Sequence, residues 1–544
     1  MTLFVAWLAI HPVSVLIFVN AIASTLLLAI FLLKIRLAWV GSTFNIDIKV
    51  TKEDLASLDD PSLPTYTVLI PMYKEAAMLP VIAAALRQMD YPLSKLDIKL
   101  VLEEDDVETI DAAKALGLES IFEILRVPTS EPKTKPKACN YALAFARGEF
   151  VTVFDAEDLP ERNQLKKVVA AFRKSGPEVA CIQARLNYYN AKENWLTRMF
   201  TLEYTLWFDF FLPALERLRI PIPLGGTSNH FHTATLRRLN AWDPYNVTED
   251  ADLGVRMTQQ NLRVGLVNST TFEEANVDTR NWLRQRSRWI KGYMQTWLVH
   301  MRDPVHLYRS VGTRGFWGFQ LFVGGTFFAA LVGPIMWVIY AIWLFADART
   351  FDPIFPPALL YLSLFNLLIG NGMFIYLTLL AAFKRQLYAL APYAFTVPAY
   401  WILQSVAGYR ALWQLIAKPF FWEKTVHGLS KHQPIDQVPA LAEPEEDSVH
   451  EQVPAVGAGD AVSPATHFQV ADPAGEDMVE ESLGVRSGDL DRPFRHVVEH
   501  GPAPQRPIGG LDILAIEDAV VPARIHAHDR LWRDPAILEG RGLE

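Results

Sequence analysis

Long apolar runs constrain the fold of this chain more than any other feature. Residues 13–33 form a run without a charged side chain, and residues 316–345 and 356–383 form two more. Each is long enough to cross the hydrocarbon core of a bilayer, which takes about 20 apolar residues. A signal peptide is the alternative for the first run, but no basic segment precedes it and no clear small-residue cleavage site follows it. The sequence therefore predicts helices that span a membrane.

Basic residues orient these runs. Lys34 and Arg36 follow the first run, and by the positive-inside rule they place its carboxyl end in the cytoplasm. A fourth apolar run, residues 387–416, is interrupted by two prolines and by Arg410. We expect it to form either one more span or a broken segment that lines a cavity.

Composition separates the tail from the rest of the chain. The net charge is -9, but residues 433–544 alone hold 22 acidic and 8 basic side chains, so the remainder is mildly basic. That remainder suits a body lying on anionic lipid, whereas the tail, rich in Pro, Ala, Gly and acids, is expected to be disordered. No basic nucleic-acid motif is present, which argues against a nucleic-acid partner. The two cysteines cannot build a disulfide framework or a zinc cluster.

Residues 65–158 alternate strand-like and helix-like segments. TYTVLIPMY, LDIKLVLEE, SIFEILRVP and EFVTVFDAED have the composition of strands, and the segments between them have helical patterns. This rhythm predicts a parallel sheet with helices on both faces. Ligands of such sheets bind beyond the carboxyl ends of the strands, where Glu103 and Asp155 stand. The predicted boundaries are a membrane helix at 1–40, a cytoplasmic α/β domain with interfacial helices at 41–302, membrane helices and a loop at 303–430, and the acidic tail at 431–544.

Two acidic turns are candidate sites of chemistry. Asp155, Glu157 and Asp158 follow an apolar strand, and carboxylates at alternate positions can converge on Mg²⁺ or Mn²⁺, which also binds phosphates. Glu249 and Asp250 begin a helix-like segment, where an ionised aspartate in a pocket can act as a general base. A solvated acidic turn and a helix N-cap are the structural alternatives.

Two basic segments are candidate ligand sites. Lys133, Lys135 and Lys137 precede a helix, where cations oppose the helix dipole. They suit an anionic ligand such as a diphosphate, or they form a solvated loop. Residues 281–292, NWLRQRSRWIKG, combine four cations with two tryptophans near a membrane run. This segment is either an interfacial anchor or a binding site for a polar ring.

The order of these motifs resembles a known family. The chain carries, in sequence, PMYKE at 71–75, Glu103, Lys137, the Asp155–Glu157 turn, the Thr248–Asp250 turn and QRSRW at 285–289. This order is similar to that of the membrane-integrated inverting glycosyltransferases of family 2, which include cellulose, hyaluronan and chitin synthases. The resemblance covers about residues 64–428, and the Q-x-x-R-W element is its most specific part. It implies a GT-A, Rossmann-like nucleotide-sugar-binding α/β domain joined to α-helical transmembrane segments, with Mg²⁺ or Mn²⁺ as cofactor.

The resemblance also implies a role for each matching position. Asp250 is the expected general base. Donor contacts are expected at Tyr73, Glu75, Lys137 and Asp155, and at Glu103 or Asp105, because the EEDD segment leaves both possible. Metal ligands are expected at Asp155 and Glu157, with Asp158 as a rival, and acceptor contacts at Gln285, Arg288, Trp289, Gly226 and Thr227. The chain departs from the family by carrying Glu157 where the pattern has a second aspartate. Arg284, Arg286 and Lys291 are expected to be membrane-surface anchors without a catalytic role.

Residues 419–428, PFFWEKTVHG, resemble an element of a bacterial β-glucan synthase branch. By position they also resemble the gating loop that covers the donor site of cellulose synthase. The expected loop residues are Phe421, Trp422, Glu423, Lys424 and Thr425, and an interfacial aromatic anchor is the alternative. A lid has to be cytoplasmic, and a simple count of spans puts it there only if the fourth run is re-entrant or split.

These features together predict a processive inverting β-glycosyltransferase of the bacterial inner membrane, with its catalytic domain in the cytoplasm. It would polymerise glucose from UDP-glucose into a β-glucan, of mixed 1,3 and 1,4 linkage by the resemblance of the loop, and pass it across the membrane. The expected partners are a UDP-sugar donor, the growing glycan, the bilayer and a periplasmic export partner. The alternatives are a non-processive transferase with a lipid acceptor and a catalytically silent membrane scaffold or regulatory subunit.

Overall fold

An eight-stranded sheet forms the centre of the α/β part. The computed structural model describes residues 7, 10–44, 46–345 and 353–431, so the acidic tail predicted to be disordered lies outside the described residues. The strand order is β3-β2-β1-β4-β7-β6-β8-β5. The strands are Tyr66–Met72 (β1), Leu96–Glu103 (β2), Glu123–Val127 (β3), Phe150–Val153 (β4), Leu159–Pro160 (β5), Val179–Tyr188 (β6), Asn229–His232 (β7) and Arg263–Glu273 (β8).

The first four strands form the parallel half that the sequence predicts, because their apolar side chains alternate between two helical layers. Val68 and Ile70 of β1 pack with α4 (Leu79–Arg87), α5 (Val107–Ala115) and α7 (Gln164–Lys174). Leu69, between them, packs on the opposite face with α6 (Lys135–Ala144) and α11 (Glu249–Gln259). This period of two is the pattern of a strand buried on both faces.

The parallel pairing predicted from residues 65–158 does not continue through the second half of the sheet, which is mixed. β7 runs antiparallel to both β4 and β6, and β5 runs antiparallel to β8. The cause lies in how the chain enters β7. The backbone N–H of Ser228 donates to the carbonyl of Val153, 3.1 Å away, at the carboxyl end of β4. A strand that starts beside the end of its neighbour has to run the opposite way.

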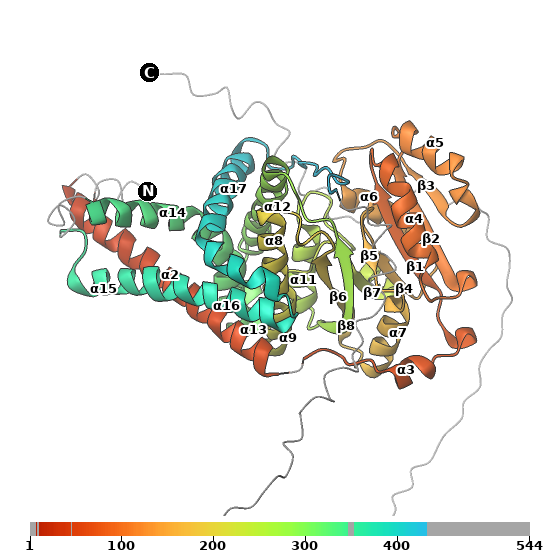
Figure 1. The fold of residues 1–544 in the computed structure, drawn as a ribbon, viewed down its shortest axis with the longest axis horizontal. Helices are drawn as coiled ribbons and strands as arrows, with labels where there is room; N and C mark the ends of the chain where they lie inside the picture. The colour runs from red at the N-terminus through yellow and green to blue at the C-terminus, as the bar shows by residue number, and fades with distance from the viewer. Residues whose placement is uncertain (1–6, 8–9, 45, 346–352, 432–544) are drawn as a thin grey trace, which may run out of the picture. The chain divides into compact units, whose positions relative to one another are not determined.

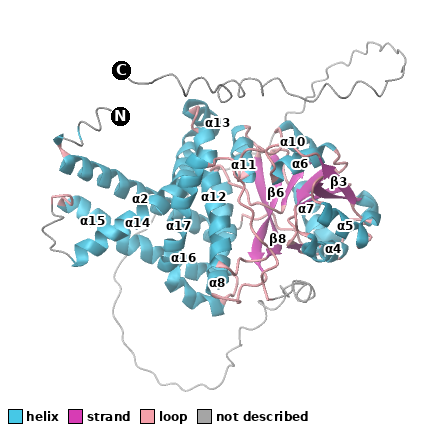
Figure 2. Cartoon of the chain, turned by 90° about the horizontal axis from the view of Figure 1, so that it is seen from above, coloured by secondary structure: helices cyan, strands magenta, loops and turns pink. Residues whose placement is uncertain are grey.

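Three helices lie between the sheet and the apolar helices (Figures 1 and 2). They are α8 (Trp195–Leu206), α12 (Thr279–His300) and α17 (Val397–Ala417), and α12 packs along α17. The side chain of Asp278 caps α12 by accepting the backbone N–H of Asn281 at 2.8 Å, the usual role of aspartate at a helix start. The shorter helices are α3 (Lys52–Ala56), α9 (Leu212–Leu218) and α10 (Thr233–Arg238).

Three helices of the described chain are long and apolar enough to cross a membrane, as predicted. They are Pro12–Thr43 (α2), Pro304–Trp343 and Pro357–Lys384. The second consists of α13 (Pro304–Phe319) and α14 (Gly325–Phe345), which are joined by a π-helix at Gln320–Gly324. The third consists of α15 (Pro357–Phe365) and α16 (Asn371–Lys384), which are joined by a π-helix at Asn366–Gly370. A third π-helix, Trp207–Phe211, joins α8 to α9.

The fourth apolar run takes the broken form. A 3-10 helix, Tyr388–Thr396, precedes α17, and both ends of this run contact the α/β part. At the start, Trp195 Nε1 donates to Thr396 Oγ1 at 2.8 Å. Past the end, Lys291 Nζ donates to the carbonyl of Phe421 at 2.6 Å. The interruption predicted for this run is therefore present as the 3-10 helix before α17.

Candidate functional site

A single cavity of about 1340 Å³ joins the carboxyl edge of the sheet to the apolar helices. Asp155, Glu157 and Asp250 line it at the sheet edge, and residues of α2, α14, α16 and α17 line it at the other end. Gln285, Arg288 and Trp289 of α12 lie along its wall. The acidic turns and the Q-x-x-R-W element, far apart in sequence, thus face one space.

Asp155 pairs with Lys135, the middle one of the three lysines predicted to bind an anionic ligand. Lys135 Nζ forms an ion pair with Asp155 Oδ1 and donates to the carbonyl of Gly226 at 2.9 Å. Burial disfavours the charged ammonium, but Asp155 and the acidic pair at 249–250 outweigh it and raise the pKa of Lys135 above its ordinary value. Lys135 is therefore a fixed positive charge on the cavity wall.

Asp158 braces the turn and does not line the cavity. Its Oδ2 accepts the backbone N–H of Asp155 at 2.7 Å and the hydroxyl of Thr227. Burial and the neighbouring Asp155 raise the pKa of Asp158 well above its ordinary range. Of the two rival metal ligands, only Glu157 faces the cavity.

Glu157 contacts the last described segment of the chain. His427 Nδ1 lies 2.7 Å from Glu157 Oε1. Burial disfavours the charged imidazole, but Glu157 outweighs it and raises the pKa of His427 to about 9. His427 belongs to the PFFWEKTVHG element, two residues beyond the last position singled out there, and the histidine of that motif was the signal that could have identified it.

Asp250 lies at the start of α11 with its carboxylate held in place. Trp242 Nε1 donates to Asp250 Oδ1 at 2.9 Å, and a Cβ added at Gly226 would stand 4.0 Å from Oδ2. Burial and the neighbouring Glu249 raise the pKa of Asp250 well above its ordinary range, while the indole N–H opposes the shift. A raised pKa makes the ionised carboxylate of Asp250 a stronger proton acceptor.

Some of the residues expected to contact the donor line the cavity, and others do not. Tyr73, Glu75 and Glu103 line the cavity, whereas Lys137 and Asp105 do not. Lys137 Nζ lies 2.9 Å from Glu103. Asp105 pairs with the first lysine of the segment, Lys133, at 2.6 Å. The three lysines thus each hold a different carboxylate.

The ammonium of Lys133 also lies 4.0 Å from the ring centroid of Tyr73. This cation–π contact fixes the face of Tyr73 that borders the cavity.

The segment after α17 closes over the sheet edge. Trp422, Lys424, Thr425 and His427 line the cavity, whereas Phe421 and Glu423 do not. Lys424 Nζ lies 3.2 Å from Glu75 and donates to the carbonyl of Tyr73. We call residues 418–431 the closing loop.

Side chains of α12 and α17 also contact the closing loop. Asn281 donates to the carbonyl of Val426 at 2.8 Å and accepts its backbone N–H at 3.1 Å. Glu423 pairs with Arg410 and accepts from Gln414 at 2.8 Å, which ties the loop to α17. The loop is therefore held by side chains of α12 and α17.

The expectation that Arg286 and Lys291 are surface anchors is wrong. Lys291 is fully buried and bonds the closing loop. Arg286 is buried and forms a two-point ion pair with Glu203 of α8. Arg284 alone of the three is exposed. Such long-range partners cannot be seen in a local stretch of sequence.

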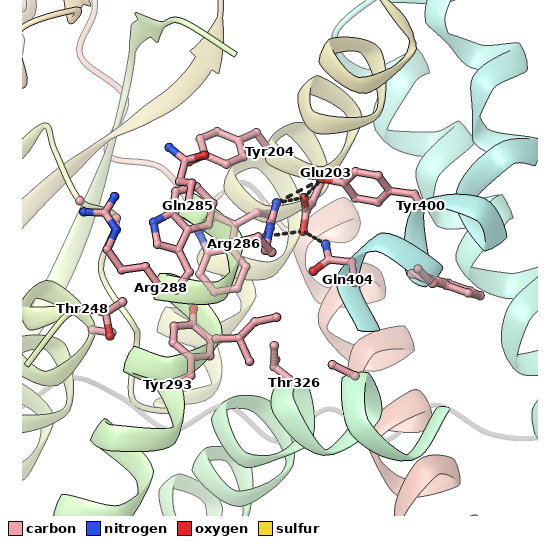
Figure 3. Close-up of a pocket in the computed structure, with 18 of the residues that line it drawn as sticks. Glu203, Tyr204, Thr248, Gln285, Arg286, Arg288, Tyr293, Thr326, Tyr400 and Gln404 are labelled. Carbon is pink, nitrogen blue, oxygen red and sulfur yellow. Dashed lines mark hydrogen bonds and ion pairs between the residues drawn. The ribbon is translucent and has the colours of Figure 1, made fainter. Parts of the chain in front are cut away.

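The three side chains of the Q-x-x-R-W element line the cavity, and each has a different contact. Gln285 accepts from Asn276 at 2.8 Å, and the Arg288 guanidinium lies 4.7 Å from the ring centroid of Trp422. Trp289 stacks near Tyr204, with ring centroids 6.1 Å apart, and Arg286 lies over its ring at 4.8 Å. Figure 3 shows Arg288 pointing away from Glu203 and Arg286 pointing toward it.

Gly292 explains how α12 approaches the Asp250 turn. A Cβ at this position would lie 2.2 Å from Oγ1 of Thr248, so only glycine permits the contact. The glycine that ends NWLRQRSRWIKG therefore sets how closely the Q-x-x-R-W element approaches the turn that holds Asp250.

A model of the family described as glycosyl transferase family group 2 matches residues 150–427, which is more than half of the chain. The chain belongs to this family. The match contains the Asp155 turn, Asp250, the Q-x-x-R-W element and most of the closing loop, and the mixed sheet is the GT-A-like fold expected from the sequence. Tyr73, Glu75 and Glu103 precede the matched residues.

The known proteins that this chain resembles share about a quarter of its residues over the matched region. A beta-monoglucosyldiacylglycerol synthase of Trichormus variabilis is 26% identical over 266 residues, covering 48% of this chain and 55% of the relative. A probable glycosyltransferase, YdaM of Bacillus subtilis, is 24% identical over 254 residues, covering 46% of this chain and 59% of the relative. The chain thus spans little more than half the length of these relatives.

Among solved structures, a mannosyltransferase of Pyrobaculum calidifontis in complex with GDP-Man and Mn²⁺ is 20% identical, with a TM-score of 0.41. The alignment covers 64% of this chain and 98% of the other.

Proposed function

We propose that this protein is a processive inverting β-glycosyltransferase of the inner membrane that polymerises glucose from UDP-glucose. The observation that supports this function best is the continuous cavity. It holds Asp155 and Asp250 at the sheet edge and continues past Trp289 between α2, α14 and α17. A transferase with a small soluble acceptor has no use for a passage among apolar helices.

The inner part of the cavity has irregular backbone in its wall, among side chains that are mostly apolar. Each of the three π-helices contributes a lining residue: Trp207, Phe322 and Asn366. π-Helical turns are rare and often occur at functional sites. Irregular backbone at membrane depth is tolerated where it lines a water-filled cavity. A glycan with hydroxyls on every ring can bond such a wall.

Asp250 takes the proton in the proposed reaction. It removes the proton of an acceptor hydroxyl, and that oxygen forms a bond to the anomeric carbon of glucose as the bond from this carbon to the diphosphate oxygen breaks. Attack from the face opposite the leaving group inverts the anomeric configuration. Lys135 and Arg288, both on the cavity wall, offer positive charge to the departing diphosphate.

The side chains at the sheet edge fit a divalent cation that is shared with the donor. Asp155 and Glu157 face the cavity and each attracts a cation, Lys135 or His427. Among the described residues no three His, Cys, Asp or Glu side chains converge on a metal site. Mg²⁺ is commonly held by one or two carboxylates plus substrate phosphates, so two suffice. Bound Mg²⁺ or Mn²⁺ would offset the charge of the leaving diphosphate.

The closing loop is proposed to cover the bound donor. Lys424 bonds the Tyr73–Glu75 turn, which is the expected nucleoside site, and Trp422 stacks with Arg288. Water excluded by such a lid cannot hydrolyse the donor.

A second candidate function is transfer of one sugar to a lipid acceptor. The name of the Trichormus relative favours it, and so do apolar residues of the inner cavity such as Phe31, Leu367 and Phe374. Both functions share the base and the donor site, and they differ in what occupies the cavity beyond Trp289.

The products separate the two functions. Purified protein in lipid nanodiscs receives radiolabelled UDP-glucose with Mg²⁺. Our proposal expects label in a high-molecular-mass fraction that linkage-specific β-glucanases release. Label that partitions into chloroform as a glycolipid, with none in polymer, would establish the second function.

A further inference from the structure

Glu203 holds a hydrogen-bond network on the cavity wall behind Trp289. Arg286 donates to both carboxylate oxygens, Tyr400 donates to Oε2 at 2.7 Å, and Gln404 Nε2 donates to Oε1 at 3.1 Å. Figure 3 shows these side chains converging on Glu203 from α12 and α17. The network adjoins the acceptor motif, because Arg286 also lies over the ring of Trp289.

Part of this network remains open to the cavity. Glu203 and Gln404 both line it, and the side chain of Glu203 is 32% exposed there. The amide oxygen of Gln404 has no hydrogen-bond donor among the residues that the structure describes. Gln404 therefore presents a free acceptor beside the carboxylate.

A cation of the first apolar helix lines the same cavity. Lys34 of α2 forms no hydrogen bond or ion pair with any described residue, and its ammonium lies 5.1 Å from the ring centroid of Phe374. Glu203 lines the same cavity, and the two charged groups do not form a direct pair. Ionisable side chains inside membrane helices are rare and usually mark a substrate path.

We propose that Lys34, Glu203 and Gln404 form a second acceptor subsite, which binds a neutral sugar ring of the growing chain behind the ring at Trp289. The ammonium donates to ring hydroxyls from one wall, while the carboxylate and the amide oxygen accept hydroxyl protons from the other. This inference rests on the proposed polymerising function. An anionic acceptor would bond Lys34 but meet the negative charge of Glu203, so a neutral ring is the better fit.

The test is the length of the product. Full-length protein in nanodiscs synthesises polymer from UDP-glucose, and product size and free glucose are measured per folded enzyme. Lys34→Met and Gln404→Leu should each shorten the chains and raise the ratio of free glucose to polymer. A hydrogen bond to a charged group contributes enough to alter chain retention by about tenfold. Lys34→Arg keeps the cation and should recover much of the length.

Arg36→Met is the matched control, because Arg36 lies two residues away on α2, is exposed and does not line the cavity. Chains of wild-type length from both Lys34→Met and Gln404→Leu would overturn the subsite. So would an equal loss of polymer and free glucose in folded variants, which would show a purely structural network. A wild-type protein that makes glycolipid and no polymer would instead remove the proposed function itself.

Discussion

His427 Nδ1 lies 2.7 Å from Glu157 Oε1, so the closing loop is paired with one of the two carboxylates that are the expected metal ligands. The same loop reaches the expected nucleoside site through Lys424 and Glu75. His427 of the closing loop and a metal cation would therefore compete for the negative charge of Glu157.

We expect His427→Gln to bind Mg²⁺ more tightly than the wild type when no donor is present. The imidazolium ion neutralises Glu157, and its removal leaves the carboxylate to the metal. Titration calorimetry of the purified protein measures the change, which should be severalfold. Asp155→Ala provides the opposite control, with weaker binding. Equal Mg²⁺ affinity in His427→Gln and the wild type would show that the ion pair does not compete.

Asp250→Asn should reduce polymer synthesis by roughly 10²–10⁴-fold, the usual contribution of a positioned general base. The amide keeps the shape of the side chain and can still lie near the Trp242 indole, but it cannot accept the acceptor's proton. Donor binding, followed by UDP titration, should remain close to that of the wild type. Polymer synthesis at near wild-type rate would exclude Asp250 as the base.

Trp242→Phe should move the acid limb of the pH–rate profile to higher pH. The indole N–H bonds the ionised form of Asp250 and so lowers its pKa against the effects of burial and Glu249. Without that bond the pKa of Asp250 rises further, and the base is lost to protonation at a higher pH. The profile of kcat/KM measures this shift, and thermal melting controls for the loss of buried indole. A profile that keeps its acid limb, or moves it to lower pH, would contradict this role of Trp242.

Lys424→Ala should raise the KM for the donor while the melting temperature stays close to that of the wild type. The substitution removes the pair with Glu75 and the bond to the Tyr73 carbonyl, which hold the loop against the expected nucleoside site. Lys418→Ala is the matched control, since Lys418 lies at the start of the same loop and pairs with no carboxylate among the described residues. Equal donor KM in the two variants would argue against a lid.

Trp289→Ala should cut polymer yield about tenfold or more, since aromatic stacking is worth roughly 1–3 kcal/mol in other systems and 1.4 kcal/mol is about one decade. Free glucose released from the donor should fall less, because Asp155 and Lys135 remain. Trp289→Phe keeps a ring beside Tyr204 and should recover part of the yield. An interfacial anchor would behave differently: both variants would lower the amount of inserted protein and leave polymer yield per molecule unchanged.

The local pattern of apolar residues is sufficient to predict the strands and helices in the first half of the α/β part. The alternation at 65–158 predicted β1 to β4 and their helices, because two-sided burial repeats every second residue. The direction of β7 was missed, since it depends on the loop that begins beside Val153. The apolar runs predicted the three long helices, because their composition alone is sufficient.

The candidate site was predicted where a motif carried it and missed where partners are remote. Asp155, Glu157, Asp250 and the Q-x-x-R-W element all face the cavity. Glu203 and Gln404 belong to no motif, and their positions follow from the packing of α8 and α17 against α12. For Lys34 the sequence predicts only the orientation of the first helix, because its sequence neighbours do not reveal the cavity that it lines.

Cryo-electron microscopy of the nanodisc-embedded protein during turnover with UDP-glucose and Mg²⁺ tests the central claim most directly. We expect density for successive sugar rings that starts beside Asp250, passes Trp289 and continues between Glu203 and Lys34 into the inner cavity. An inner cavity filled by the acyl chains of a lipid whose headgroup reaches Asp250 would contradict a polymerising enzyme and establish a lipid acceptor.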